Sequence, residues 1–199
     1  MKNIFLSTYS GESPEAGCDE AGRGCLAGPV VAAAVVLGAG SVPTIIRDSK
    51  KLSAKKREEA AKWIKEFALD WSVQAVSPTE IDKYNILQAS FMAMNRAVAQ
   101  LNPKPEYLLI DGNRFVCTSG LPFACIVKGD QKIPSISAAS ILAKTERDRI
   151  MKDLHQKYPH YQWDKNKGYP TREHRLSLAK WGPSPHHRKT FRNSVPTLL

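Results

Sequence analysis

The run from Val30 to Leu37 most limits what this chain can fold into, because it consists only of Val, Ala and Leu. Such a run predicts a strand that is buried on both faces. The slightly longer apolar stretch Pro29–Leu37 is far too short to span a bilayer. We therefore expect a soluble protein with this strand inside its core and no association with a membrane.

Four further segments are predicted to be strands, and helical segments follow the third and fifth strands in the chain. The other strands cover Ala16–Gly22, Trp71–Val76, Tyr107–Ile110 and Ala124–Val127. Helices are predicted from Ser53, as N-cap, to Leu69, then from Ser77–Glu80 onward, and over Ile86–Leu101, Ser135–Lys157 and Arg172–Trp181. Ile45–Leu52 is expected to be a polar loop. This order predicts an α/β domain with a helical C-terminal appendage.

The charge of the chain favours a polyanionic partner. It has 29 Lys and Arg against 19 Asp and Glu, a formal net charge of +10, and most of the excess follows Lys144. Nucleic acid is the first expectation and an anionic membrane the second. We expect residues 1–157 to form a catalytic core. Residues 158–199 should form a basic, substrate-binding appendage of the same domain.

Aromatic residues lie among the basic residues of this appendage, including Tyr161, Trp163 and Tyr169. Such rings can stack on sugars or bases while Lys and Arg meet phosphates. Alternatively, they dock the appendage onto the core, and we expect some of each. Arg188 and Lys189 are predicted to contact the phosphate backbone.

The cysteines indicate a reducing compartment. None of the four forms a CxxC pair or lies at zinc-like spacing from a histidine. The apolar stretch Ile4–Leu6 is too short for a signal-peptide core. We expect a cytoplasmic protein that is a monomer.

Carboxylates lie in or at the ends of three predicted strands. Asp19 and Glu20 are in the first strand, Asp111 ends the fourth, and Asp130 ends the fifth. Neighbouring strand residues point to opposite faces, so Asp19 and Glu20 are not both expected to point straight into one pocket. Any one of these carboxylates alone could be an ordinary surface or cap residue.

If the four carboxylates converge, they would repel one another unless a cation lay between them. Ligands that are all oxygen favour Mg²⁺ or Mn²⁺ over zinc. Two such ions about 4 Å apart can activate a water and stabilise the leaving oxygen of a phosphodiester. The turn Gly22-Arg23-Gly24 follows Asp19 and Glu20 in the chain. It could bring backbone amides and a guanidinium to a sugar or phosphate. A tight turn with no other role is the alternative.

Seven segments in order resemble bacterial type 2 ribonuclease H (ribonuclease HII). The resemblance covers nearly the whole chain, from about Ala16 to Phe191, with no departure at a catalytic position. The segments are Gly17–Gly24, Asp48–Leu52, Ile110–Asn113, Val127–Asp130, Ile136–Lys144, Lys167–Thr171 and His186–Phe191.

The resemblance implies a ribonuclease H-like fold, with a five-stranded mixed sheet flanked by helices. It implies that the four carboxylates named above are catalytic and hold the metal ions. It also implies that Gly22, Arg23 and Gly24 contact the junction ribonucleotide and that Tyr169 stacks on a neighbouring sugar. Contacts to phosphates near the cut are implied for Lys50, Lys51 and Lys144.

The residues, together with what the resemblance implies, predict a metal-dependent endoribonuclease that hydrolyses RNA in RNA–DNA hybrids and incises 5′ of ribonucleotides embedded in duplex DNA. Its products would carry 3′-hydroxyl and 5′-phosphate ends. One alternative is another nuclease or strand-transferase of the same superfamily. A second is a nucleic-acid-binding module without catalysis, against which the four intact acidic positions argue. His174, His186 and His187 are expected to be structural or phosphate contacts rather than general acids.

Overall fold

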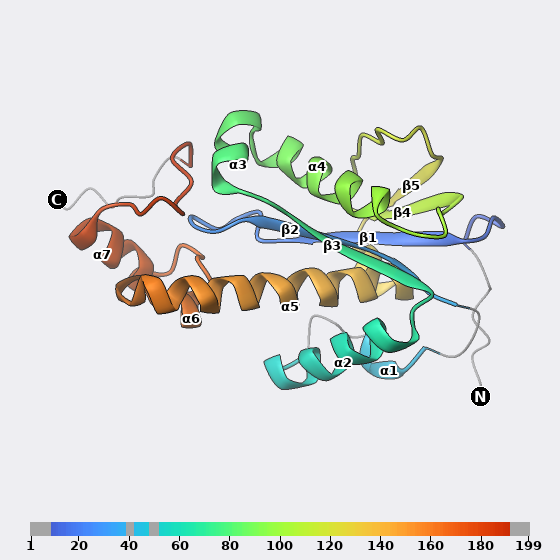
Figure 1. The fold of residues 1–199 in the computed structure, drawn as a ribbon, viewed down its shortest axis with the longest axis horizontal. Coiled ribbons are helices and arrows are strands. Elements are labelled where there is room, and N and C mark those ends of the chain that lie inside the picture. Colours follow the sequence, from blue (N-terminus) through green and yellow to red (C-terminus); the bar gives the residue numbers. More distant parts are fainter. Residues whose placement is uncertain (1–8, 39–41, 48–51, 192–199) are drawn as a thin grey trace.

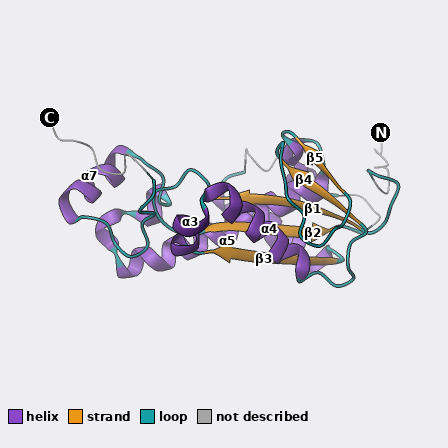
Figure 2. Ribbon diagram, turned by 90° about the horizontal axis from the view of Figure 1, so that it is seen from above, coloured by secondary structure: helices purple, strands orange, loops and turns teal. Residues whose placement is uncertain are grey.

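The computed structural model describes residues 9–38, 42–47 and 52–191. A five-stranded sheet forms the middle layer, with helices on both of its faces (Figures 1 and 2). The strands are β1 (Glu15–Ala21), β2 (Val30–Val36), β3 (Asp70–Val76), β4 (Tyr107–Asp111) and β5 (Phe123–Ile126). Their order across the sheet is β3-β2-β1-β4-β5.

The sheet is mixed, as expected. β1 pairs antiparallel with β2, and β2 pairs antiparallel with β3. In contrast, β1, β4 and β5 run parallel to one another. Every residue of β2 is buried, which confirms the prediction of a central strand covered on both faces. The fold class predicted from the sequence is therefore confirmed.

Seven α-helices are described, and they cover the sheet and extend it at one end. They are α1 (Thr44–Arg47), α2 (Ala54–Phe67), α3 (Pro78–Tyr84), α4 (Ile86–Ala99), α5 (Pro134–Lys157), α6 (Trp163–Asn166) and α7 (Arg172–Trp181). Helix α4 packs on one face of the sheet, whereas α5 packs on the other with α2 against it (Figure 1). Two apolar layers of the core result, one on each side of β1 and β2.

The helix starts follow from local capping. Ser53 accepts a hydrogen bond from the backbone N–H of Lys56, as its predicted N-cap role requires. Ser77 and Glu80 form a reciprocal capping box at the start of α3. One local prediction was wrong. Residues Thr44–Arg47 form a short helix at the start of the segment expected to be a polar loop, because Ile46 is fully buried in the cluster that α2 and α5 also line; residues 48–51 of that segment lie outside the described residues.

The described part of the appendage extends beyond the C-terminal half of α5 and ends beside the loop between β1 and β2 (Figure 1). Its backbone meets that loop directly, since Ala27 forms an isolated bridge with His187 and the N–H of Leu26 bonds the carbonyl of Gly168. No helix in the described ranges is both long and apolar enough to cross a membrane.

Candidate active site

The parallel pairing of β1 and β4 places two of the predicted carboxylates side by side. Cys18 of β1 lies opposite Ile110 of β4, so Asp19 and Asp111 follow at the same level of neighbouring strands. The negative charge of Asp111 acts on both Asp19 and Glu20. The structure therefore brings three of the four carboxylates predicted from the sequence into one electrostatic cluster.

Asp19 is the most strongly perturbed member of this cluster. Its side chain is 5% exposed, and its Oδ1 accepts the backbone N–H of Glu20 at 2.7 Å. Burial, followed by the neighbouring Glu20 carboxylate, raises the pKa of Asp19 to about 8. A hydrogen bond with Ser140 and the positive charge of Lys144 lower this pKa, but they do not outweigh burial.

Lys144 is partly buried beside Asp19. Its Nζ donates to the Ser140 hydroxyl at 2.6 Å, and that hydroxyl also bonds Asp19. A chain of hydrogen bonds therefore joins α5 to the carboxylate of β1. The phosphate contact expected for Lys144 stays a prediction, and its position beside Asp19 is compatible with it.

Glu20 points toward the predicted substrate turn. Burial raises its pKa, and the guanidinium of Arg23, 3.2 Å from Oε1, acts in the opposite direction. Arg23 remains about half exposed. An ion pair of this exposure contributes little to stability, so Arg23 is available to another anion.

Asp130 does not end a strand, which corrects the sequence-based placement. β5 ends at Ile126, and Asp130 lies in the 3-10 helix Gly129–Gln131, where it is 2% exposed. The chain reaches this turn through Lys128 in a left-handed conformation, with φ of 56°. Gly129 donates its N–H to Asp111 Oδ1 at 2.7 Å, which ties the turn to the end of β4.

The donor chemistry of this cluster fits a hard divalent cation. Its candidate ligands are all carboxylates, and burial together with mutual repulsion raises the pKa of both Asp19 and Glu20. A bound cation would offset both effects. Within the described ranges, no three acidic, histidine or cysteine side chains stand close enough to enclose an ion together. The chemistry of these residues therefore fits a divalent cation, although their side chains are not arranged around one common point.

The Gly22–Gly24 turn is held from below by two buried arginines. Gly22 has φ of +94°, and a Cβ there would lie 2.0 Å from Nε of Arg147. Arg188 donates to the carbonyls of Gly22 and Arg23 at 2.7 and 2.8 Å, and to that of Gly28. The carbonyls of Gly22 and Arg23 are thus bound to protein, while the residues Arg23 and Gly24 are exposed.

The phosphate contact predicted for Arg188 is wrong. Its side chain is only 1% exposed, and all of its guanidinium nitrogens donate to backbone carbonyls. Lys189 next to it is exposed, so a phosphate contact there stays a prediction. Lys50 and Lys51 lie outside the described residues.

The ring of Tyr169 is partly exposed to solvent and partly packed against the protein. It is 46% exposed, which rules out a core aromatic. The guanidinium carbon of Arg147 lies 5.7 Å from the centre of its ring. Its backbone belongs to a turn that contacts the β1–β2 loop through Gly168. An exposed ring at this place is available for stacking on a sugar.

The histidines of the appendage form a buried network. Nδ1 of His187 accepts the Ser184 N–H, so the proton of its neutral ring is on Nε2, which donates to Nε2 of His174 at 3.1 Å. His174 accepts from Trp163 as well and donates from Nδ1 to the carbonyl of Tyr169 at 2.9 Å. These two histidines are therefore structural, as expected. Tyr161 and Trp163 are buried with them, so these rings dock the appendage.

This network predicts a loss of stability in acid. Burial, followed by the proximity of His174, lowers the pKa of His187 from 6.5 to about 4. The unfolded chain then binds more protons than the folded chain between these values, so stability is full above pH 6.5 and falls as the pH drops toward 4. The expected loss is about 3 kcal/mol. Chemical denaturation of the wild type and of His187→Gln across this range measures it; parallel pH curves would contradict the assignment.

Arg147 and Ser140 are the site-supporting residues that the sequence reasoning missed. Both lie in α5, and Arg147 is 2% exposed. A signal was present, because Arg147 stands four residues after buried Ala143 and four before buried Met151. A basic residue on the buried stripe of a helix indicates a specific role for its guanidinium.

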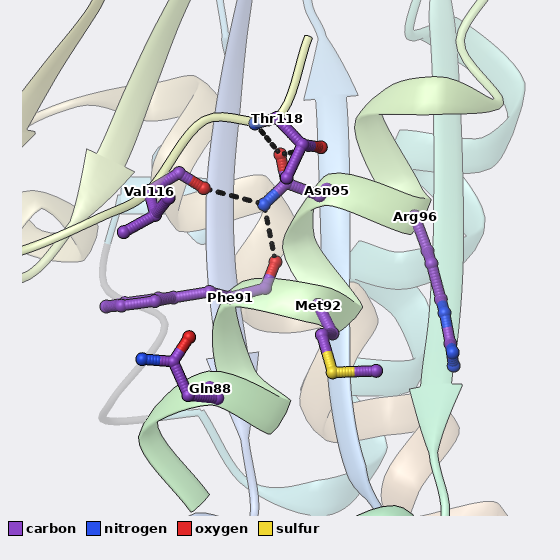
Figure 3. A pocket seen from close by; sticks show the side chains of 7 residues that line it. All are labelled: Gln88, Phe91, Met92, Asn95, Arg96, Val116 and Thr118. Carbon is purple, nitrogen blue, oxygen red and sulfur yellow. Dashed lines mark hydrogen bonds between the residues drawn. The ribbon is translucent and has the colours of Figure 1, made fainter. Parts of the chain in front are cut away.

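A shallow pocket elsewhere on the molecule lies between α4 and the β4–β5 connection, and none of the four carboxylates lines it (Figure 3). Asn95 fixes this connection by donating to the Val116 carbonyl and accepting from Thr118, at 2.8 and 2.9 Å. The candidate active site is therefore the carboxylate cluster, not this pocket.

A mixed sheet that carries Asp19 and Asp111 on adjacent parallel strands, beside a basic C-terminal segment, fits the class of hydrolytic enzymes that act on nucleic acids. Comparison with known proteins gives the family. The model of the ribonuclease HII family matches residues 16–195. Ribonuclease HII of Bacteroides thetaiotaomicron is 56% identical over 177 residues, which cover 89% of this chain and 88% of that protein. The chain therefore belongs to the ribonuclease HII family and is an endoribonuclease.

Solved structures agree with this placement. The ribonuclease H2 of Pyrococcus horikoshii is 27% identical, with a TM-score of 0.77 and coverage of 90% of this chain and 94% of that one. The ribonuclease HII of Archaeoglobus fulgidus, solved in a complex with PCNA, is 29% identical with a TM-score of 0.76. The match covers 93% of this chain and 98% of that protein. The sequence resemblance is thus confirmed by both sequence and fold.

Proposed function

We propose that this chain hydrolyses RNA in RNA–DNA hybrids and incises 5′ of single ribonucleotides in duplex DNA, using Asp19, Glu20, Asp111 and Asp130. The observation that carries the proposal is the buried carboxylate cluster next to the Gly22–Gly24 turn and the exposed ring of Tyr169. The products would carry 3′-hydroxyl and 5′-phosphate ends.

The four carboxylates would hold two divalent ions, Mg²⁺ or Mn²⁺. When bound, these ions would supply an activated water and charge stabilisation at the leaving oxygen. Residues of the chain orient the carboxylates and add positive charge. Ser140 and Lys144 orient Asp19 through hydrogen bonds, and Gly129 orients Asp111 in the same way. Lys144 also brings a positive charge to the place where a phosphate would bind.

Recognition of one ribonucleotide would rest on the 2′-hydroxyl, the group that distinguishes a ribose from the deoxyriboses around it. The turn Gly22–Gly24 begins two residues after Glu20, so a sugar bound to its amides would place its phosphate near the carboxylates. The carbonyls of Gly22 and Arg23 are bound to Arg188, which keeps the turn in one conformation. Tyr169 would then stack on the adjacent deoxyribose.

Family membership decides against another nuclease or strand-transferase of the superfamily. Membership of an endoribonuclease family also argues against a non-catalytic binding module, and cleavage measurements test this. Three labelled duplexes are needed: all-DNA, DNA with one ribonucleotide, and an RNA–DNA hybrid. We expect Mg²⁺- or Mn²⁺-dependent cleavage of the last two and none of the first. Binding to all three without cleavage would refute the proposal.

Tyr169→Ala tests the recognition step. We expect it to cut the single-ribonucleotide duplex at least roughly tenfold more slowly, a change of about 1.4 kcal/mol, while its thermal stability is kept, because nearly half of the ring is already exposed. Trp181→Ala, which removes another exposed aromatic of the appendage, is the control. Equal losses of stability and activity in Tyr169→Ala would mark Tyr169 as structural.

A further inference from the structure

Arg147 of α5 joins two segments that are distant in the sequence. Its Nε donates to the carbonyl of Pro29 at 3.1 Å, and its Nη2 donates to that of Ala27 at 3.1 Å. Its Nη1 donates to the carbonyl of Lys167 at 2.9 Å, on the turn that leads to Tyr169. One planar guanidinium therefore bridges the β1–β2 loop and this second turn, in addition to the backbone bond between Leu26 and Gly168.

The same guanidinium contacts both elements that the proposed function uses to read sugars. It lies directly beneath Gly22, where it occupies the space that a Cβ would need. Its carbon also lies 5.7 Å from the centre of the Tyr169 ring, on the ring's protein side. Because Arg147 is 2% exposed, neither contact is available to substrate. Any effect of Arg147 on cleavage must then be transmitted through these two elements.

We propose that Arg147 is a positioning residue that sets the spacing between the Gly22–Gly24 turn and Tyr169. This spacing determines the preference for a ribose followed by a deoxyribose. The inference rests on the proposed function, in which the turn holds the ribose and Tyr169 holds the adjacent deoxyribose. A long RNA–DNA hybrid contains no such junction inside its RNA strand, so it depends less on the spacing.

Arg188 offers an internal comparison. It is as deeply buried as Arg147, but its hydrogen bonds go to Gly22, Arg23 and Gly28, all on the turn side. Arg188 therefore supports the turn alone, whereas Arg147 links the turn to Tyr169. Loss of Arg188 should slow cleavage of both substrates together, and loss of Arg147 should affect the junction substrate more.

The experiment measures the ratio of cleavage rates for a single-ribonucleotide duplex and an RNA–DNA hybrid. The variants are Arg147→Met, Arg147→Lys and, as a control on the same helix, Arg149→Met. Arg149 is exposed and paired with Glu146 and Asp153, so its loss removes the same charge without touching either turn. We expect Arg147→Met to lower the ratio on the order of tenfold and Arg149→Met to leave it unchanged.

Arg147→Lys keeps the charge but loses the planar fork that reaches three carbonyls. We expect it to be more stable than Arg147→Met and still to have a lowered ratio. It also decides the question if Arg147→Met does not fold. A wild-type ratio in a folded Arg147→Lys variant would overturn the proposal, because charge alone would then suffice.

A double substitution separates positioning from general damage. In a Tyr169→Ala background, replacing Arg147 with Lys should change the ratio no further, because the element through which Arg147 acts is gone. A further fall in the ratio would overturn the link between the two residues. A wild-type enzyme that cut the hybrid but not the single-ribonucleotide duplex would contradict the proposed function instead. The two failures can therefore be told apart.

Discussion

Asp111→Asn is expected to fold like the wild type and to lose cleavage on the order of a thousandfold. The charge is removed from a carboxylate that acts electrostatically on both Asp19 and Glu20. If these residues hold divalent ions, the substitution weakens their positioning and the stabilisation of charge in the transition state at once. Steady-state cleavage of both ribonucleotide-containing substrates measures the loss.

Folding should not suffer from this substitution. The Asn side chain keeps an oxygen that can accept the Gly129 N–H, now 2.7 Å from Asp111 Oδ1. It also removes repulsion between carboxylates in the metal-free protein. Asp153→Asn, which neutralises an exposed carboxylate on α5, is the matched control. An Asp111→Asn variant that kept more than about a tenth of wild-type turnover would count against Asp111 as a ligand.

The framework of the fold could be predicted because its signals are local. The all-apolar run of β2 indicates a doubly buried strand, and the Ser53 and Ser77 caps follow from hydrogen bonds within one turn. The convergence of Asp19 and Asp111 was not local. It depends on the parallel pairing of β1 with β4, which the sequence indicated only through its resemblance to a family.

The roles of the arginines were not predictable in the same way. Arg188 stands in a basic, exposed-looking segment, and its charge suggested a phosphate contact. Its burial is decided by the carbonyls of Gly22, Arg23 and Gly28, more than 150 residues away in the chain. Periodicity shows which face of a helix is buried. It does not show that distant carbonyls will satisfy a guanidinium on that face.

A pair of glycine substitutions should distinguish how the Gly22–Gly24 turn is held in place from how it contacts a sugar. At Gly22, an alanine must adopt φ near +94°, and its Cβ would displace the buried guanidinium of Arg147. Strain and lost hydrogen bonds together should cost about 2–4 kcal/mol. At Gly24, a Cβ would meet no protein atom within 4 Å. Gly24→Ala should therefore unfold at the wild-type temperature.

Both variants are expected to cut the single-ribonucleotide duplex more slowly, for different reasons. Gly22→Ala moves the turn, so its melting temperature and its activity on every ribonucleotide substrate should fall together. Gly24→Ala leaves the turn in place and obstructs only a ligand that approaches the backbone closely. Thermal melts and cleavage rates of the two variants measure this difference. Full activity of Gly24→Ala would mean that no sugar approaches the turn there, and full stability of Gly22→Ala would mean that Arg147 does not hold it.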